Sequence, residues 1–192
     1  MNQYIKPVPL EKSYRLVNHG PTTLVSARHD GQDDVMAAAW TCGLDFSPPK
    51  LTVVLDKITK TRELIEKAGA FVIQVPTVAL AQITHYVGTH SMSSEPGKLA
   101  SAGVELFQID GVDLPFVSGC AAWLACRLIP ELHNQQNYDL FIGEVTGAWA
   151  DERVFRKGHW EFDSADPALR SLHYISGGQF YAIGNEVTVN EI

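Results

Sequence analysis

The ten residues from Asp34 to Gly43 read DVMAAAWTCG, and the interpretation of the whole chain starts from them. Three consecutive alanines precede one tryptophan, and small side chains of this kind leave a strand backbone open to another body. A flat heteroaromatic ring along this ribbon could form hydrogen bonds with main-chain groups while Trp40 supplies an apolar wall. The same pattern also suits residues that pack a barrel interior of uneven width. The stretch alone leaves both interpretations open.

Segments typical of strands lie on both sides of this ribbon. The Asp30-Gly31 pair is a strong signal for a tight turn and predicts a hairpin between the first two segments. Pro48-Pro49 predicts an extended approach to the third, because proline fixes its own φ and restricts the residue before it. Six or more strands in a short chain favour a closed or partly closed barrel. The segments, rich in apolar and β-branched residues, are 22–28, 35–40, 51–55, 71–75, 120–129 and 140–150.

Helical spacing is limited to two short stretches. Apolar residues recur three and four positions apart at 61–68 and 78–87, which predicts two short helices. The interval from Gly88 to Gly103 shows little periodicity, and a loop of this length in a compact domain is often functional. We therefore expect one mainly β domain over residues 1–192, with a few short helices and a loop that covers a ligand.

Composition narrows the class of protein. The chain has 192 residues, of which 45% are hydrophobic and 19% charged, so it can bury a sizeable core and an oligomer interface. Its formal net charge of −7 argues against a non-specific nucleic-acid binder. No apolar run approaches the roughly 20 residues of a membrane span, and no signal-peptide core is present at the start. We expect neither nucleic acid nor membrane as a partner, and a cytoplasmic location.

The cysteines and known motifs exclude several chemistries. Cys42, Cys120 and Cys126 are too few and too irregularly spaced for a disulfide framework or a zinc site. We expect Cys42 to be buried, and Cys120 and Cys126 to face one side of a single strand. The sequence has no GxGxxG after a strand, no phosphate-binding GxxxxGK[ST] and no GxSxG. A Rossmann unit, a serine hydrolase and a metal site are therefore unsupported.

A cationic segment follows the third predicted strand. Between Lys57 and Arg62 the chain places three cations and two threonines in six positions, at the expected start of a helix. Free backbone N–H groups and the positive end of a helix dipole favour a phosphate there. The alternative is a solvated first turn with Thr61 as its N-cap. The local excess of positive charge in an acidic chain favours the phosphate.

Several short motifs follow one another along the chain. They are Asn18-His19-Gly20-Pro21, Val35–Trp40 ahead of Pro48-Pro49, Lys57-x-x-x-Thr61 with Arg62–Ile65, Gly69-x-Phe71-Val72, Val75-Pro76, Gly88-x-x-Ser91 with Lys98, Leu124-x-Cys126, Phe141–Val145 and Ser176-Gly177-Gly178-x-x-Tyr181. This order, from about Tyr14 to Gly184, resembles the flavin reductase-like family, especially its flavoredoxin-like branch.

The resemblance implies a split β-barrel that binds FMN, usually as a homodimer with the flavin near the subunit interface. Residues 36–40 would flank the ring, Thr41 and Cys42 would lie near the ribityl chain and phosphate, and a threonine–lysine set would hold the phosphate. Ser91 and Lys98 would close over the flavin, with Lys98 stabilising charge on the reduced ring. The complete implied cofactor set is Met36, Ala37, Ala38, Ala39, Trp40, Thr41, Cys42, Lys57, Thr59, Thr61, Ser91 and Lys98.

The activity implied by the resemblance is that of an NAD(P)H:FMN oxidoreductase, a flavin reductase that transfers a hydride from NADH or NADPH to flavin N5. Two alternatives stay open. The chain could be a non-catalytic FMN-binding electron carrier reduced by a partner protein, or an oligomeric barrel that binds no flavin. The sequence identifies neither the preferred nicotinamide nor an acceptor such as a monooxygenase.

Overall fold

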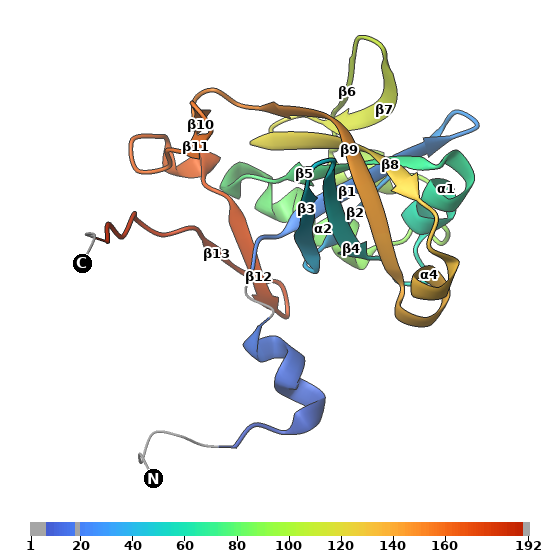
Figure 1. Cartoon of the computed structure of the whole chain (residues 1–192), viewed down its shortest axis with the longest axis horizontal. Coiled ribbons are helices and arrows are strands. Elements are labelled where there is room, and N and C mark those ends of the chain that lie inside the picture. The colour runs from blue at the N-terminus through green and yellow to red at the C-terminus, as the bar shows by residue number, and fades with distance from the viewer. Residues whose placement is uncertain (1–6, 18–19, 190–192) are drawn as a thin grey trace.

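Seven strands form one antiparallel sheet that curls into a split barrel in the computed structural model, which describes residues 7–17 and 20–189 (Figure 1). The mainly β prediction is therefore confirmed. Asn18 and His19, which belong to the first family motif, lie outside the described residues. The strand order is β2-β1-β5-β8-β9-β4-β3, made of β1 (Thr23–His29), β2 (Gln32–Ala38), β3 (Thr41–Phe46), β4 (Pro49–Val54), β5 (Ala70–Val75), β8 (Ala122–Ile129) and β9 (Leu140–Ala150).

The predicted first hairpin is present. His29 pairs with Gln32, and Asp30 and Gly31 form the turn with φ of 48° and 73°, a conformation that Asp and Gly tolerate better than most residues. β2 ends at Ala38, so Trp40 lies just beyond the strand that was predicted to include it.

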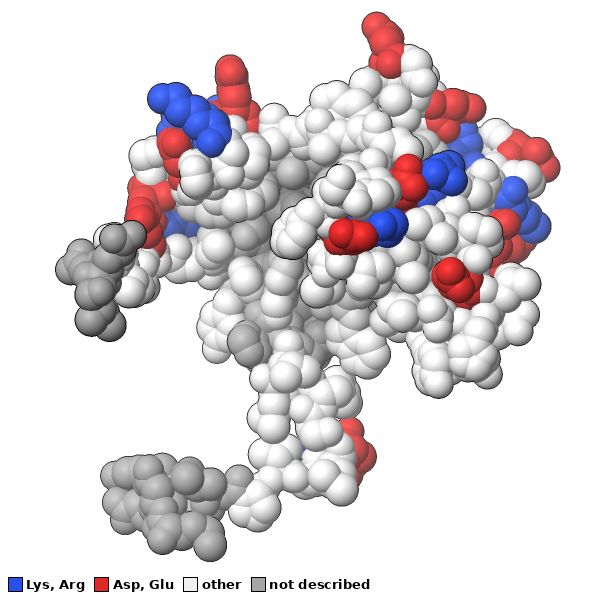
Figure 2. All heavy atoms as spheres, viewed as in Figure 1, with Lys and Arg blue, Asp and Glu red and all other residues white. Residues whose placement is uncertain are grey.

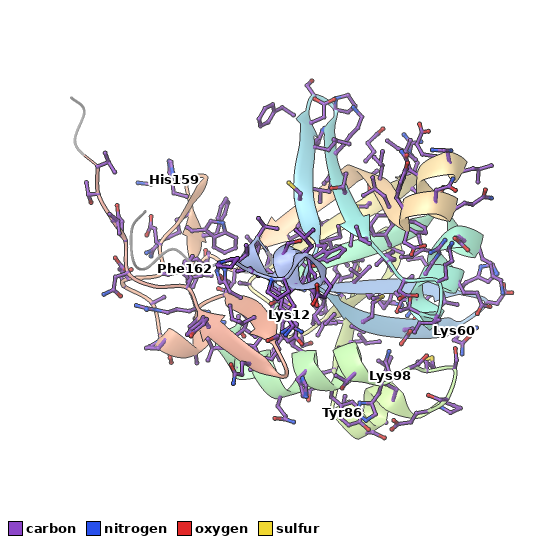
Figure 3. The ribbon with its side chains drawn as sticks, turned by 90° about the horizontal axis from the view of Figure 1, so that it is seen from below. Lys12, Lys60, Tyr86, Lys98, His159 and Phe162 are labelled. Carbon is purple, nitrogen blue, oxygen red and sulfur yellow. The ribbon has the colours of Figure 1, made fainter. Side chains whose placement is uncertain are left out.

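The extended approach predicted from Pro48-Pro49 is confirmed from Pro49 onward, since Pro49 is the first residue of β4 and leads directly to Leu51. Pro48 instead lies with Ser47 in the turn of the hairpin between β3 and β4, where Phe46 pairs with Pro49. β3 escaped prediction because five of its six residues are exposed in this chain, so it lacks the alternation of buried and exposed residues that marks a strand. The hairpin projects from the barrel (Figure 3).

Three small hairpins complete the strands. Their strands have two to six residues, too few to show a clear period in the sequence. They are β6 (Leu106–Ile109) with β7 (Val112–Val117), β10 (Phe155–Arg156) with β11 (His159–Trp160), and β12 (Leu172–Ser176) with β13 (Gln179–Ala182).

Short helices close the ends and faces of the barrel. The two predicted helices are present, but the interval 88–103 is not one open loop, because α2 continues to Thr89 and α3 occupies its end. η1 extends away from the barrel (Figure 1). No helix within 7–17 and 20–189 is long and apolar enough to cross a membrane. The helices are α1 (Lys60–Ala68), α2 (Ala81–Thr89), α3 (Lys98–Ala102), α4 (Leu132–Tyr138), η1 (Leu10–Leu16), η2 (Val78–Leu80) and η3 (Pro167–Leu169).

The main core lies between the sheet and α1. Val25, Val53, Leu64, Phe71 and Phe141 are buried together there, and each such side chain contributes about 1.5–3 kcal/mol when removed from water. β9 passes close to β5 and β8 at Gly143, where a Cβ atom would lie 2.6 Å from Cζ of Phe71. Only glycine leaves room for this aromatic ring.

The cysteines differ from expectation. Cys120 precedes β8 and Cys126 lies within it, so the two do not share a strand, although both are buried. Cys42 in β3 is exposed, not buried, because the hairpin that carries it projects from the barrel.

Candidate functional site

Three neighbouring cavities follow β2 from the start of α1 to Trp40, and we refer to them together as the groove. Their volumes are about 140, 130 and 470 Å³, and we call them the α1 pocket, the central pocket and the hairpin pocket. The first two share Gly88 and Thr89, and the last two share Ala39. Small-molecule sites usually occupy roughly 300–1,000 Å³, so the two inner cavities become a site of that size only as parts of the groove.

The α1 pocket contains the uncapped start of a helix. Thr59 is the N-cap of α1, but its hydroxyl donates to the carbonyl of Asp56 at 2.7 Å and caps no N–H group. The first-turn N–H groups therefore lack a side-chain acceptor among the described residues, and they lie at the positive end of the helix dipole. Thr59, Lys60 and Ser91 line this pocket, which suits an anion.

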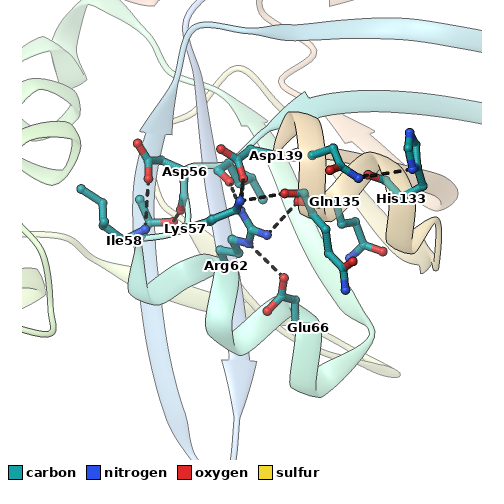
Figure 4. Close-up of polar contacts among 12 residues, drawn as sticks. Asp56, Lys57, Ile58, Arg62, Glu66, His133, Gln135 and Asp139 are labelled. Atoms are coloured by element: carbon teal, nitrogen blue, oxygen red, sulfur yellow. Dashed lines mark hydrogen bonds and ion pairs between the residues drawn. The ribbon is translucent and has the colours of Figure 1, made fainter.

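Two of the three cations of the segment face away from the pocket, toward α4 (Figure 4). Arg62 is buried and donates to the carbonyls of Leu55 and Gln135 and to Asp139, at 2.6–2.9 Å. Lys57 donates to the carbonyl of Gln136 at 2.7 Å. Lys60 is the cation of this segment that lines the pocket, although the set of cofactor residues implied by the resemblance did not include it.

Thr61 and Lys98 also differ from the positions that the resemblance implied. The Thr61 hydroxyl donates to Asp34 Oδ2 at 2.7 Å, so it points into the protein and does not cap the helix. Lys98 lies in α3, not in an open loop, and its Nζ is 2.7 Å from Asp34 Oδ1. The Lys98 and Asp34 side chains are only 2% and 1% exposed, although both residues border the α1 pocket.

The central pocket lies between β2, α2 and the β12–β13 hairpin. Its floor is Ala37–Ala39, and α2 approaches so closely that a Cβ atom on Gly88 would lie 3.0 Å from Cβ of Ala37. The alanine ribbon thus lines a cavity, and its contact with a flavin stays a prediction. Tyr174 and Phe180 of the C-terminal hairpin and His85 of α2 form the opposite side.

Two buried hydroxyl groups in this pocket have no hydrogen-bond partner within the described residues. They belong to Thr22 and Thr84, whose side chains are 2% and 0% exposed and which both line the cavity. An unsatisfied buried hydroxyl costs about 1–3 kcal/mol, so a native structure rarely keeps one without use. The polar edge of a ligand would satisfy these groups where it reaches them. These residues were missed by the sequence analysis, although Thr84 lies one helical turn before Gly88.

The hairpin pocket is the open end of the groove. Trp40, Thr41 and Cys42 line it together with Tyr14 of η1, whose ring meets that of Trp40 edge to face at 6.1 Å. The Thr41 hydroxyl lies 2.8 Å from that of Thr23. Thr41 and Cys42 thus border a different cavity from Thr59 and Thr61, and the structure does not bring the two pairs together.

The segment between α2 and α3 is fixed by its own polar contacts. The Tyr86 hydroxyl donates to Glu95 at 2.8 Å, and this bond lowers the pKa of the Glu95 carboxyl and raises the pKa of Tyr86. His90 stacks on Tyr86 with ring centres 3.9 Å apart. The carbonyl of Ser91 accepts from the N–H group of Glu95 at 2.9 Å. Ser91 is thus held at the edge of the α1 pocket.

The groove fits a phosphorylated planar ligand. An uncapped helix start lies at one end, a backbone ribbon of small residues along the middle, and an aromatic wall at the other end. Within the described residues, no group of three or more His, Cys, Asp and Glu side chains could hold a metal ion. Fold and groove together define a split-barrel protein with a row of ligand-sized cavities along β2.

Comparison with known proteins assigns the family. Residues 15–177 match the model of the flavin reductase like domain, and the chain belongs to this family. It is 41% identical over 191 residues to the protein YddH of Escherichia coli (strain K12), covering 98% of this chain and 99% of that one.

Solved structures agree with this assignment. An FMN-binding domain of a flavin reductases-like enzyme from Shewanella baltica OS155 is 66% identical, with a TM-score of 0.88 and coverage of 95% and 96% of the two chains. The flavoredoxin of Desulfovibrio vulgaris (Miyazaki F) is 25% identical, with a TM-score of 0.76 and coverage of 98% and 96%.

Thiol labelling tests the exposed position of Cys42. Burial raises the pKa of Cys126 to about 12 and raises that of Cys120 further, so neither forms a thiolate at neutral pH. We expect an aromatic disulfide reagent at pH 8 to label one thiol of the native chain and three in denaturant. Cys42→Ser should remove the fast reaction. Labelling that persists in this variant would contradict the structure.

Proposed function

We propose that this protein binds FMN in the groove along β2 and acts as an NAD(P)H-dependent flavin reductase. The observation that carries the proposal is the succession of neighbouring cavities along β2, from the uncapped start of α1 over Ala37–Ala39 to Trp40. The 66% identity to a structure described as an FMN-binding domain supports the same ligand.

Different parts of FMN would contact different residues along the groove. The first-turn N–H groups of α1, with Thr59, Lys60 and Ser91, would hold the phosphate. Main-chain groups of the alanine ribbon would lie along the ring, and the hydroxyls of Thr22 and Thr84 would hydrogen bond its polar atoms. Trp40 and Thr41 would border the outer end of the ligand.

When bound, FMN supplies the redox chemistry by accepting a hydride from NADH or NADPH. The residues of the chain would position the ring. Tyr174 and Phe180 line the central pocket with aromatic side chains, and His85 contacts Phe180 at the same wall. Lys98 does not serve as an electrostatic group at the ring in this arrangement, because Asp34 already holds it.

Thr84→Val tests the role of the unsatisfied hydroxyls. We expect the ligand-free variant to be at least as stable as the wild type, because the lost hydroxyl has no partner among the described residues and its burial without one is unfavourable. FMN should bind about three- to tenfold more weakly, the effect of one hydrogen bond of about 0.5–1.5 kcal/mol. Quenching of flavin fluorescence measures the dissociation constant, and thermal unfolding measures stability.

Thr77→Val is the matched control for that variant. Thr77 is also buried, but its hydroxyl donates to the carbonyl of Gly119 at 3.0 Å, so its loss should cost about 1 kcal/mol of stability. It lines none of the three cavities, and FMN binding should not change. Equal FMN affinity in wild type and Thr84→Val would remove Thr84 from the site.

Reduction by nicotinamide nucleotides tests the activity itself. The purified chain, loaded with FMN and kept without oxygen, should lose its absorption near 450 nm within seconds after addition of NADH or NADPH. A flavin that binds but stays oxidised with both donors would favour the alternative, an electron carrier reduced by a partner protein. Absence of flavin binding at micromolar concentrations would refute both.

We also propose that the protein is a homodimer. The open end of the groove continues into the exposed apolar β3–β4 hairpin, on which Leu44 and Phe46 are 52% and 98% exposed. Charged side chains are sparse in the lower middle of the face in Figure 2. A second copy is the occupant that would cover this hairpin and add a wall to the hairpin pocket. The cytoplasmic location and a monooxygenase or similar acceptor stay predictions.

Phe46→Asp tests the dimer. A charge at the tip of the hairpin should convert the dimer to a monomer in light scattering, because it would be desolvated in the interface. Leu132→Asp on α4 is the control, since Leu132 is 66% exposed but lies outside the three cavities. Its mass should match that of the wild type. A wild-type monomer at micromolar concentration would contradict the proposal.

A further inference from the structure

The two lysines that line the α1 pocket each form an ion pair with a carboxylate, but one pair is partly exposed and the other is buried. Lys60 lies 2.9 Å from Glu63, and both side chains are partly exposed, at 18% and 44%. Lys98 lies 2.7 Å from Asp34, and both side chains are almost fully buried, at 2% and 1%. Lys60 and Lys98 lie at the same end of the molecule in Figure 3.

These two pairs differ in how readily a ligand could displace the carboxylate. An exposed ion pair contributes little and can open at small cost, so a phosphate could take Lys60 from Glu63. Glu63 would keep a second partner, since Lys67 lies 2.6 Å from it. Taking Lys98 from Asp34 would leave a buried carboxylate without its cation, which is strongly unfavourable.

Asp34 also accepts a hydrogen bond from one of the hydroxyl groups that line this pocket. Thr61 donates to Asp34 Oδ2 at 2.7 Å, while Lys98 contacts Oδ1. Because Asp34 engages both Lys98 and Thr61, neither side chain is available to an anion in the pocket. The carboxylate of Asp34 also places a negative charge beside the pocket.

We infer that Asp34 limits the preference of this site for phosphorylated over unphosphorylated flavins, because it neutralises Lys98 and so removes one cation from the phosphate site. This inference rests on the proposed flavin site. FMN would still gain from the N–H groups of α1 and from Lys60, but by less than an unpaired Lys98 would allow, and Asp34 would be a specificity-determining residue that acts through Lys98.

The test is a cycle of variants in which two dissociation constants are measured by fluorescence quenching. The quantity compared is the Kd of riboflavin divided by the Kd of FMN. Asp34→Asn should raise this ratio at least about tenfold, the effect of one charge-assisted hydrogen bond from the released Lys98. Lys98→Met should lower it, because Asp34 then repels the phosphate without compensation. The double variant Asp34→Asn/Lys98→Met should return to within about threefold of wild type.

A structural role alone would not produce this pattern. Loss of packing in the pocket would weaken both flavins together and leave the ratio unchanged, which would overturn the inference, as would a shift in the same direction in both single variants. Should Asp34→Asn fail to fold, the ratios of Lys98→Met and the double variant still decide, and an unchanged Lys98→Met ratio refutes the inference.

Inorganic phosphate separates this inference from the proposed function. Added phosphate should raise the unfolding temperature of Asp34→Asn more than that of the wild type, whether or not flavin binds. A wild type that binds neither flavin refutes the flavin site alone if the phosphate response still differs. Flavin binding with equal phosphate responses and equal ratios refutes only the role of Asp34.

Discussion

The buried carboxylate of Asp34 connects the three elements that build the inner end of the groove. It lies on β2, accepts from Thr61 of α1 and pairs with Lys98 of α3. A buried ion pair is a weak source of net stability, but its members cannot be separated without large cost. The start of α1, the ribbon of β2 and the segment before α3 are therefore held in one arrangement. The shape of the anion pocket depends on this constraint, although the same constraint limits the charge that the pocket can offer.

Arg62 is a second buried cation, and it anchors the segment 57–62, whose Thr59 and Lys60 line the α1 pocket. Arg62 joins α1 to α4 and the start of β9 through Asp139 and two carbonyls, and its guanidinium lies 5.0 Å from the ring centre of Phe141. It fixes the direction of α1, and with it the direction of the first-turn N–H groups. Arg62 therefore helps to position the α1 pocket, although it does not line this pocket.

Most of the fold could be predicted from the sequence because the strands of the barrel alternate or bury apolar residues. The strand 140–150 has the predicted bounds. β3 could not be found, since five of its six residues are exposed and show no alternation of buried and exposed positions. For the site, the alanine ribbon and the cationic turn were identified, but the direction of each charge was not. Lys57 and Arg62 form hydrogen bonds with residues 79 and 77 positions later in the chain, in and after α4. Asp34 of β2 forms an ion pair with Lys98 of α3. Such pairings depend on tertiary contacts that local composition does not contain.

The two ends of the groove favour different sources of binding energy. At the α1 end, ion pairs offset the lysines and leave mainly neutral N–H donors for an anion. At the hairpin end, the walls are aromatic and open, and exposed apolar side chains continue beyond the pocket. Because burial of apolar area is roughly additive and charge attraction here is already compensated, a planar ligand would gain affinity mainly from its ring. That gain grows when a second copy covers the open end, so binding and dimer formation would strengthen each other through shared burial. The affinity of this site is then set at its open end, while the buried Asp34 determines how far the phosphate matters.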